Sequence, residues 1–153
     1  MQRMLNKKIL IIDDDERFLR ALGKTLRSEG AEVLATQWPV EAIDILSETE
    51  KVDLVITDLR MPVVSGGMLL HSIRLMSPDL PIIVLTAFAS AETKIEALRQ
   101  GATAFLEKNL TTAGLFAAIE KVFELQKRVS ESAETATHRD TGKLADQIED
   151  EVP

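Results

Sequence analysis

Three carboxylates, one hydroxyl and one lysine stand where short apolar runs of this sequence end, and together they could act on a phosphoryl group. Asp13 and Asp14 follow the first such run, Asp58 follows another, and Thr86 and Lys108 stand at the ends of two more. Carboxylates crowded together repel one another, and left alone one of them tends to stay protonated. A divalent cation such as Mg²⁺ resolves that conflict. A carboxylate in such a site can act as a nucleophile and form an aspartyl-phosphate.

Lys108 and Thr86 supply the other groups that this chemistry needs. The lysine ammonium is a compact positive charge on a flexible stem, which suits a phosphoryl oxygen. The threonine hydroxyl can donate a hydrogen bond to another phosphoryl oxygen. Because phosphoryl transfer needs in-line positioning and cancellation of charge rather than further covalent help, these residue types predict a site that phosphorylates its own carboxylate.

The segments that hold these residues alternate between strand and helix patterns. Five short apolar runs are typical of parallel strands covered on both faces, namely residues 8–12, 32–35, 53–57, 81–85 and 104–106. Helical patterns lie between them, at residues 17–28, from Pro39 past Leu46, at 66–76 and at 91–100. A last helix is expected to begin at a cap, Thr111 or Thr112, and to run to about Arg128.

This alternation predicts an α/β fold with a doubly wound five-stranded parallel sheet, a (βα)5 pattern with the flavodoxin-like strand order 2-1-3-4-5. Ligands of such sheets bind beyond the carboxyl ends of the strands, at the point where the strand order switches. Four of the five predicted strand ends carry the polar residues named above. We therefore expect these residues to meet at one edge of the sheet.

The composition argues against several other classes of function. The chain has 153 residues, a formal net charge of −7 and no cysteine, which argues against nucleic-acid binding by this chain and excludes thiolate metal sites. Its apolar runs are far shorter than the roughly 20 residues of a membrane span, and the first is too short for a signal-peptide core. We expect a cytoplasmic protein that makes no membrane contact.

The acidity is concentrated at the carboxyl end of the chain. Residues 129–153 hold 2 basic and 7 acidic side chains, whereas residues 1–128 hold 16 basic and 18 acidic ones. The final stretch is also poor in large apolar residues, so it buries too little to offset the entropy of ordering. We expect a folded domain over 1–128 and an acidic, flexible tail or linker over 129–153.

Four segments resemble a response-regulator receiver domain of two-component or phosphorelay signalling. They are ILIIDDDERFLR (9–20), VDLVITDLRMPVVSGGMLL (52–70), PIIVLTA (81–87) and AFLEKN (104–109). The resemblance covers roughly residues 7–128. It implies a phosphorylation-activated switch rather than an enzyme: a sensor histidine kinase or a phosphotransfer protein supplies the phosphoryl group, and the domain catalyses only its own phosphorylation and dephosphorylation.

The resemblance also implies which residues form the reaction site. Asp58 matches the phosphoacceptor. Asp13 and Asp14 match the acidic pair that holds Mg²⁺, Asp14 as a direct ligand and Asp13 largely through water. The backbone carbonyl of Arg60 completes the implied protein ligands of the metal.

A second group of residues matches the part of the family that reports phosphorylation. Thr86 matches both the switch hydroxyl and the hydroxyl of the reaction site, where Lys108 matches the family's lysine. Phe105 matches the switch aromatic, which turns inward when the hydroxyl moves. These changes imply a shift of the fourth helix, the fifth strand and the fifth helix. That face is then expected to bind an effector protein or a second copy of the chain.

The sequence departs from the family pattern in the last loop. The family has proline after the lysine, with a cis peptide, whereas Asn109 stands here. A cis bond before a non-proline residue costs about 3–4 kcal/mol, so either the bond is trans and Lys108 is shifted, or strain is retained. Arg60 and Phe88 occupy positions that in this family tune the loss of the phosphoryl group to water, and the bulky Phe88 is expected to slow that loss.

Two other functions remain open from the sequence. A receiver-like module that binds partners without phosphorylation is favoured by the missing proline, but the intact set of acids, hydroxyl and lysine argues against it. A phosphatase of the haloacid-dehalogenase type also uses an aspartate nucleophile after a strand. That class needs a second aspartate two residues later, where Arg60 stands, and a cap domain for which the sequence has no candidate.

Overall fold

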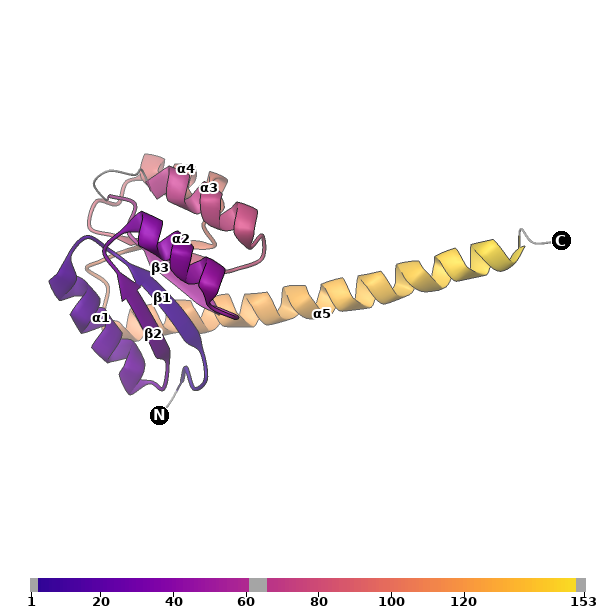
Figure 1. Cartoon of the computed structure of the whole chain (residues 1–153), viewed down its shortest axis with the longest axis horizontal. Helices are drawn as coiled ribbons and strands as arrows, with labels where there is room; N and C mark the ends of the chain where they lie inside the picture. Colours follow the sequence, from indigo (N-terminus) through magenta and orange to yellow (C-terminus); the bar gives the residue numbers. More distant parts are fainter. Residues whose placement is uncertain (1–2, 61–65, 151–153) are drawn as a thin grey trace.

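A five-stranded parallel sheet lies between two layers of helices in the computed structural model of the chain, which describes residues 3–60 and 66–150 (Figure 1). The strands are β1 (Lys8–Ile12), β2 (Glu32–Thr36), β3 (Leu54–Thr57), β4 (Ile82–Thr86) and β5 (Ala104–Glu107). Their order is β2-β1-β3-β4-β5, and every neighbouring pair is parallel. The predicted fold class and strand order are confirmed.

The helices divide between the two faces of the sheet. One face is covered by α1 (Glu16–Ser28) and α5 (Thr112–Asp150), and the other by α2 (Pro39–Glu48), α3 (Gly66–Met76) and α4 (Ala91–Arg99). Alternate side chains of a strand point to opposite faces. In β1, Ile9 and Ile11 therefore pack into the α1–α5 core, while Leu10 and Ile12 pack into the α2–α4 core. Burial on both faces explains why the strand is almost wholly apolar.

The register of the sheet brings the carboxyl ends of four strands to one edge. Ile12 pairs with Thr57, Thr57 with Val84, and Thr86 with Glu107. Since all these strands run in the same direction, the residues that end or follow them leave the sheet on the same side. The edge predicted to carry the chemistry is therefore formed by β1, β3, β4 and β5.

The last helix is longer than the sequence analysis predicts. It begins after Thr111, whose Oγ1 accepts a hydrogen bond from Gly114 N at 3.0 Å, but the expected end near Arg128 is wrong because α5 continues to Asp150. Figure 1 shows the second half of α5 extending away from the sheet and the other helices. The low apolar content of this stretch does not by itself end a helix, because the backbone hydrogen bonds of a helix lie within the segment. The division of the chain at residue 128 stays a prediction.

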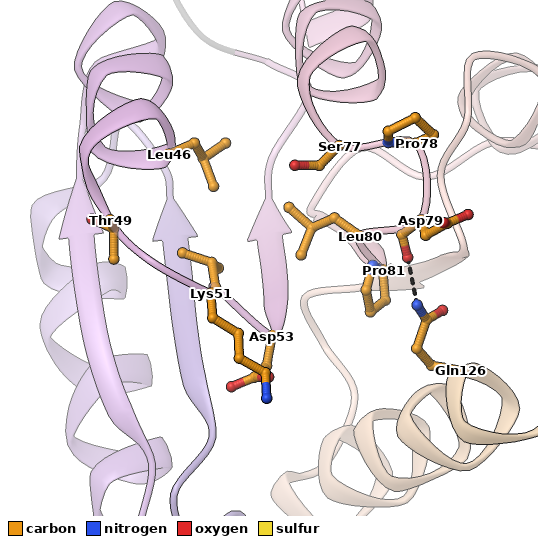
Figure 2. A pocket seen from close by; sticks show the side chains of 11 residues that line it. Leu46, Thr49, Lys51, Asp53, Ser77, Pro78, Asp79, Leu80, Pro81 and Gln126 are labelled. Atoms are coloured by element: carbon orange, nitrogen blue, oxygen red, sulfur yellow. Dashed lines mark hydrogen bonds between the residues drawn. The ribbon is translucent and has the colours of Figure 1, made fainter. Parts of the chain in front are cut away.

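A hydrogen bond ties α5 to the loop between α3 and β4, near the point where the helix leaves the rest of the fold. Gln126 Nε2 donates to Asp79 O at 2.7 Å, the dashed line in Figure 2. The pocket in that figure has a volume of about 450 Å³ and lies at the amino edge of the sheet, where Asp53 and Pro81 lead into β3 and β4. It is therefore on the opposite edge from the carboxylates.

Within the described residues, no helix is both long and apolar enough to cross a membrane.

Candidate functional site

Three carboxylates meet at the carboxyl edge of the sheet. Asp13, Asp14 and Asp58 bring one oxygen each to within 4.8 Å of one another. Asp13 and Asp58 are buried, whereas Asp14 is exposed. The ends of β1 and β3 are held together because Asp58 N donates to Ile12 O at 3.1 Å. The structure thus brings together the three acids that the sequence analysis places at one site.

Lys108 reaches into this cluster from the end of β5. Its Nζ lies 2.5 Å from Asp13 Oδ2 and 3.0 Å from Asp58 Oδ2. The described residues contain no cis peptide bond, so the bond from Lys108 to Asn109 is trans. The missing proline therefore does not keep the lysine from the two carboxylates.

Burial and charge oppose each other at these groups. Burial raises the pKa of Asp13, because desolvation outweighs the attraction of Lys108 and the hydrogen bond from Asp15 N. Burial alone would lower the pKa of Lys108, but its contacts with Asp13 and Asp58 outweigh that effect and the pKa is raised. The lysine is therefore charged at neutral pH. With all three carboxylates ionised, the cluster carries a formal charge of −2.

The donor set and its charge fit a magnesium ion. Mg²⁺ takes oxygen ligands, keeps several waters and is commonly held by a small number of carboxylates. Asp13 Oδ2 is buried with the Lys108 ammonium beside it, whereas the carboxylate of Asp14 is exposed. A doubly charged cation cancels the formal charge of the cluster.

Thr86 and Phe105 lie at and beside the same edge. Thr86 is buried at the end of β4, and its Oγ1 accepts a hydrogen bond from Phe88 N at 3.2 Å. Because the oxygen acts as acceptor in this bond, the hydroxyl proton is still able to donate. Phe105 pairs with Val84 in the sheet and packs, partly buried, against the α2–α4 core. The switch roles of both residues remain predictions.

A contact between Arg60 and Phe88 joins the loops after β3 and β4. The guanidinium carbon of Arg60 lies 4.0 Å from the centroid of the Phe88 ring, within cation–π range. Arg60 N donates a hydrogen bond to Asp58 Oδ1 at 3.1 Å, and Phe88 N donates one to Thr86 Oγ1 at 3.2 Å. Each loop is thus held to a residue of the predicted site. The sequence analysis names both side chains but does not predict that they touch, because their contact depends on how two separate loops approach each other.

The first turn of α1 contributes two residues that sequence reasoning leaves outside the site. Asp15 is the N-cap of α1 and accepts hydrogen bonds from Arg17 N and Phe18 N. Phe18 has the helical spacing of a core residue, yet its ring centroid lies 4.3 Å from Lys108 Nζ. Helical periodicity identifies the buried face of α1 but carries no signal for a contact with the loop after β5.

Comparison with known proteins decides the family. The family model of the response regulator receiver domain matches residues 9–120. The chain is a response regulator receiver domain. It is 39% identical over 116 residues to the transcriptional regulatory protein GlrR of Escherichia coli strain K12, a match that covers 76% of this chain and 26% of that protein. The receiver domain thus spans about a quarter of the length of this relative.

Solved receiver structures share this fold. A response regulator receiver domain protein from Clostridium thermocellum is 33% identical with a TM-score of 0.75, and the match covers 80% of this chain and 98% of that one. The chemotaxis protein CheY4 of Vibrio cholerae is 30% identical with a TM-score of 0.72, covering 76% and 98% of the two chains. Receiver domains of response regulators are phosphorylated by histidine kinases and act as signalling switches. The resemblance stated from the sequence is confirmed.

Proposed function

We propose that this receiver domain accepts a phosphoryl group on Asp58 from a sensor histidine kinase or a phosphotransfer protein. The observation that supports this most directly is the position of Lys108 Nζ between the buried carboxylates of Asp13 and Asp58. A carboxylate held beside a cation and further acids has the surroundings that phosphoryl transfer requires. In the proposed step, an Asp58 oxygen forms a bond to phosphorus as the bond from phosphorus to the donor breaks.

In this proposal Asp13, Asp14, Asp58 and the backbone carbonyl of Arg60 hold Mg²⁺. When bound, the ion offsets the negative charge of the carboxylates and of the phosphoryl oxygens. Arg60 N orients the acceptor by its hydrogen bond to Asp58 Oδ1. Lys108 stabilises the product because its ammonium is already beside the acceptor and is charged at neutral pH.

Thr86 and Phe105 are proposed to report the modification. A phosphoryl group on Asp58 adds oxygens that accept a hydrogen bond from the Thr86 hydroxyl. Movement of that side chain disturbs its bond with Phe88 N and the packing beside Phe105. The face formed by α4, β5 and α5 then changes, and we propose that an effector or a second copy binds there. Ile95 and Leu98 already present exposed apolar surface on α4.

The proposal is tested by incubating the protein with acetyl phosphate in the presence of Mg²⁺ or of a chelator. We expect one phosphoryl group per chain, stable in acid and released by hydroxylamine, and no adduct once the metal is chelated, because the acids then repel the incoming group. Intact-protein mass spectrometry measures the adduct. A folded protein that takes no phosphoryl group in Mg²⁺ contradicts the proposal and favours a module that binds partners without phosphorylation.

Replacing Phe88 with alanine is expected to shorten the lifetime of the phosphorylated state. The ring stacks on Arg60 beside the acceptor, and its removal opens a path for water. Loss of a cation–π contact of about 0.5–1 kcal/mol corresponds to decay that is roughly two- to fivefold faster. The matched control is Trp38→Ala, because Trp38 and Phe88 are aromatic side chains with similar exposure, 54% and 56%, and Trp38 precedes α2, away from the α4–β5–α5 face. The phosphorylated fraction is followed over time by mass spectrometry after the donor is removed, and unchanged or slower decay in Phe88→Ala contradicts the expected role.

A further inference from the structure

Phe18 contacts the site lysine, Lys108, but is not among the groups proposed to bind Mg²⁺ or the phosphoryl group. Its ring centroid lies 4.3 Å from Lys108 Nζ, well inside the roughly 6 Å range of a cation–π contact. The ring is partly buried and packs against the α1–α5 core. Its position is therefore set by core packing, and it offers the ammonium a fixed surface.

Contacts among four residues form a closed ring around the start of α1. Asp15 N donates to Asp13 Oδ1 at 2.9 Å, and Phe18 N donates to Asp15 Oδ1 at 3.2 Å. Lys108 Nζ then joins the Phe18 ring to Asp13 Oδ2. The capped turn thus fixes the carboxylate of Asp13 and the backbone of Phe18 relative to each other, and the ammonium lies between that carboxylate and the Phe18 ring.

We propose that Phe18 is a positioning residue that keeps the Lys108 ammonium beside Asp58, an inference that rests on the proposed phosphorylation of Asp58. Lysine carries its charge on a flexible four-carbon stem, so its contacts decide where the charge lies. Both of its carboxylate contacts, Asp13 and Asp58, are also proposed holders of the divalent cation. With both engaged there, the ring of Phe18 is a contact of Lys108 that competes with neither the metal nor the phosphoryl group.

Two variants of Phe18 separate this role from simple packing. Phe18→Leu keeps an apolar side chain and removes the aromatic face, whereas Phe18→Tyr keeps the face. The matched control is Phe123→Leu, because Phe123 also packs, partly buried, on the α1–α5 core and lies 5.0 Å from another lysine, Lys7. That contact is remote from the carboxylates.

The first measurement needs no phosphorylation. In the NMR spectrum of the unmodified protein, assigned with Lys108→Arg, the ring current of Phe18 is expected to shift the ε-methylene protons of Lys108 upfield. The shift should persist when Mg²⁺ is added. It should disappear in Phe18→Leu and remain in Phe18→Tyr and Phe123→Leu.

The second measurement is the rate of labelling by acetyl phosphate at saturating Mg²⁺. We expect Phe18→Leu to be about two- to tenfold slower, and Phe18→Tyr and Phe123→Leu to stay within about twofold of wild type. The inference is overturned if Phe18→Leu is labelled at the wild-type rate, if Phe18→Tyr is as slow as Phe18→Leu, or if the Lys108 protons show no ring-current shift. If the wild type takes no label, the proposed function fails, while the NMR shift still decides whether Phe18 holds Lys108.

Discussion

Asp58→Asn is expected to abolish phosphoryl labelling of the protein. The amide that replaces the carboxylate is neutral and cannot form the aspartyl-phosphate, so labelling should fall by at least about 100-fold, below detection. The two side chains have nearly the same shape, and an amide oxygen still accepts from Arg60 N where Asp58 Oδ1 does now. Lys108 also retains its contact with Asp13. The variant is therefore expected to stay folded, so the loss of labelling is attributed to the missing carboxylate and not to unfolding.

Intact-protein mass spectrometry after incubation with acetyl phosphate and Mg²⁺ measures this effect. Asp44→Asn is the matched control, because Asp44 is an exposed aspartate on α2, away from the cluster, and we expect full labelling of that variant. Circular dichroism confirms that both variants are folded. An adduct that persists in Asp58→Asn would falsify the assignment of the acceptor and direct attention to Asp13 or Asp14.

Lys108→Met is expected to lower the free energy of unfolding by about 3–5 kcal/mol when no divalent cation is present. The side chains of Asp13 and Asp58 are 2% and 5% exposed, so removal of the lysine leaves two buried carboxylates without their counter-charge. Methionine keeps most of the volume of the lysine stem, which limits the loss of packing. Urea denaturation followed by circular dichroism measures the difference, and Lys94→Met, at an exposed position of α4, is the control with little expected effect.

The pH dependence of this loss distinguishes charge from packing. In the wild type the pKa of Lys108 is raised, so its stabilising charge is present at all pH below the ordinary value of 10.5 and is lost only as the pH rises through the higher folded value. The pKa of Asp13 is already raised by burial, and removal of the lysine raises it further. A carboxyl with a raised folded pKa destabilises the fold as the pH rises and ceases to do so once protonated.

The loss in free energy of unfolding caused by Lys108→Met should therefore shrink as the pH falls. At neutral pH it should also shrink when Mg²⁺ is added. The metal should also bind more tightly to the variant, since the cluster loses a positive charge and its formal charge changes from −2 to −3. If the loss in free energy of unfolding depends on neither pH nor Mg²⁺, Lys108 stabilises the fold by packing and not by its charge.

The sheet and the gathering of its polar residues follow from local patterns. Apolar runs such as 8–12 are long enough for buried strands, and parallel topology then places Asp13, Asp58 and Lys108 at one edge whatever the details of the loops. The length of α5 does not follow in the same way. Its second half has the composition of a solvated segment, and the prediction of its end relied on the lack of core-forming residues. That lack does not end a helix by itself, because helical hydrogen bonds lie within the segment.

The contacts of Phe18 with Lys108 and of Arg60 with Phe88 are beyond the reach of sequence patterns. Each joins side chains from elements that are distant in the chain and depends on the rotamer of a long cationic side chain. Spacing along the chain predicts which face of a helix is buried, but it does not predict which neighbouring loop lies over its first turn. These contacts position side chains at the edge of the site, whereas the acids and the lysine are its charged groups.

The long final helix has a mechanical consequence. With 39 residues and a rise of 1.5 Å per residue, α5 is about 58 Å long, and the part beyond Gln126 accounts for about 36 Å of that length. A change of only about 5° in its inclination on the sheet displaces the far end by roughly 3 Å if the helix pivots at Gln126. A helix that pivots at this hydrogen bond to Asp79 would act as a lever arm and turn ångström-scale repacking near the sheet into a larger displacement of its far end.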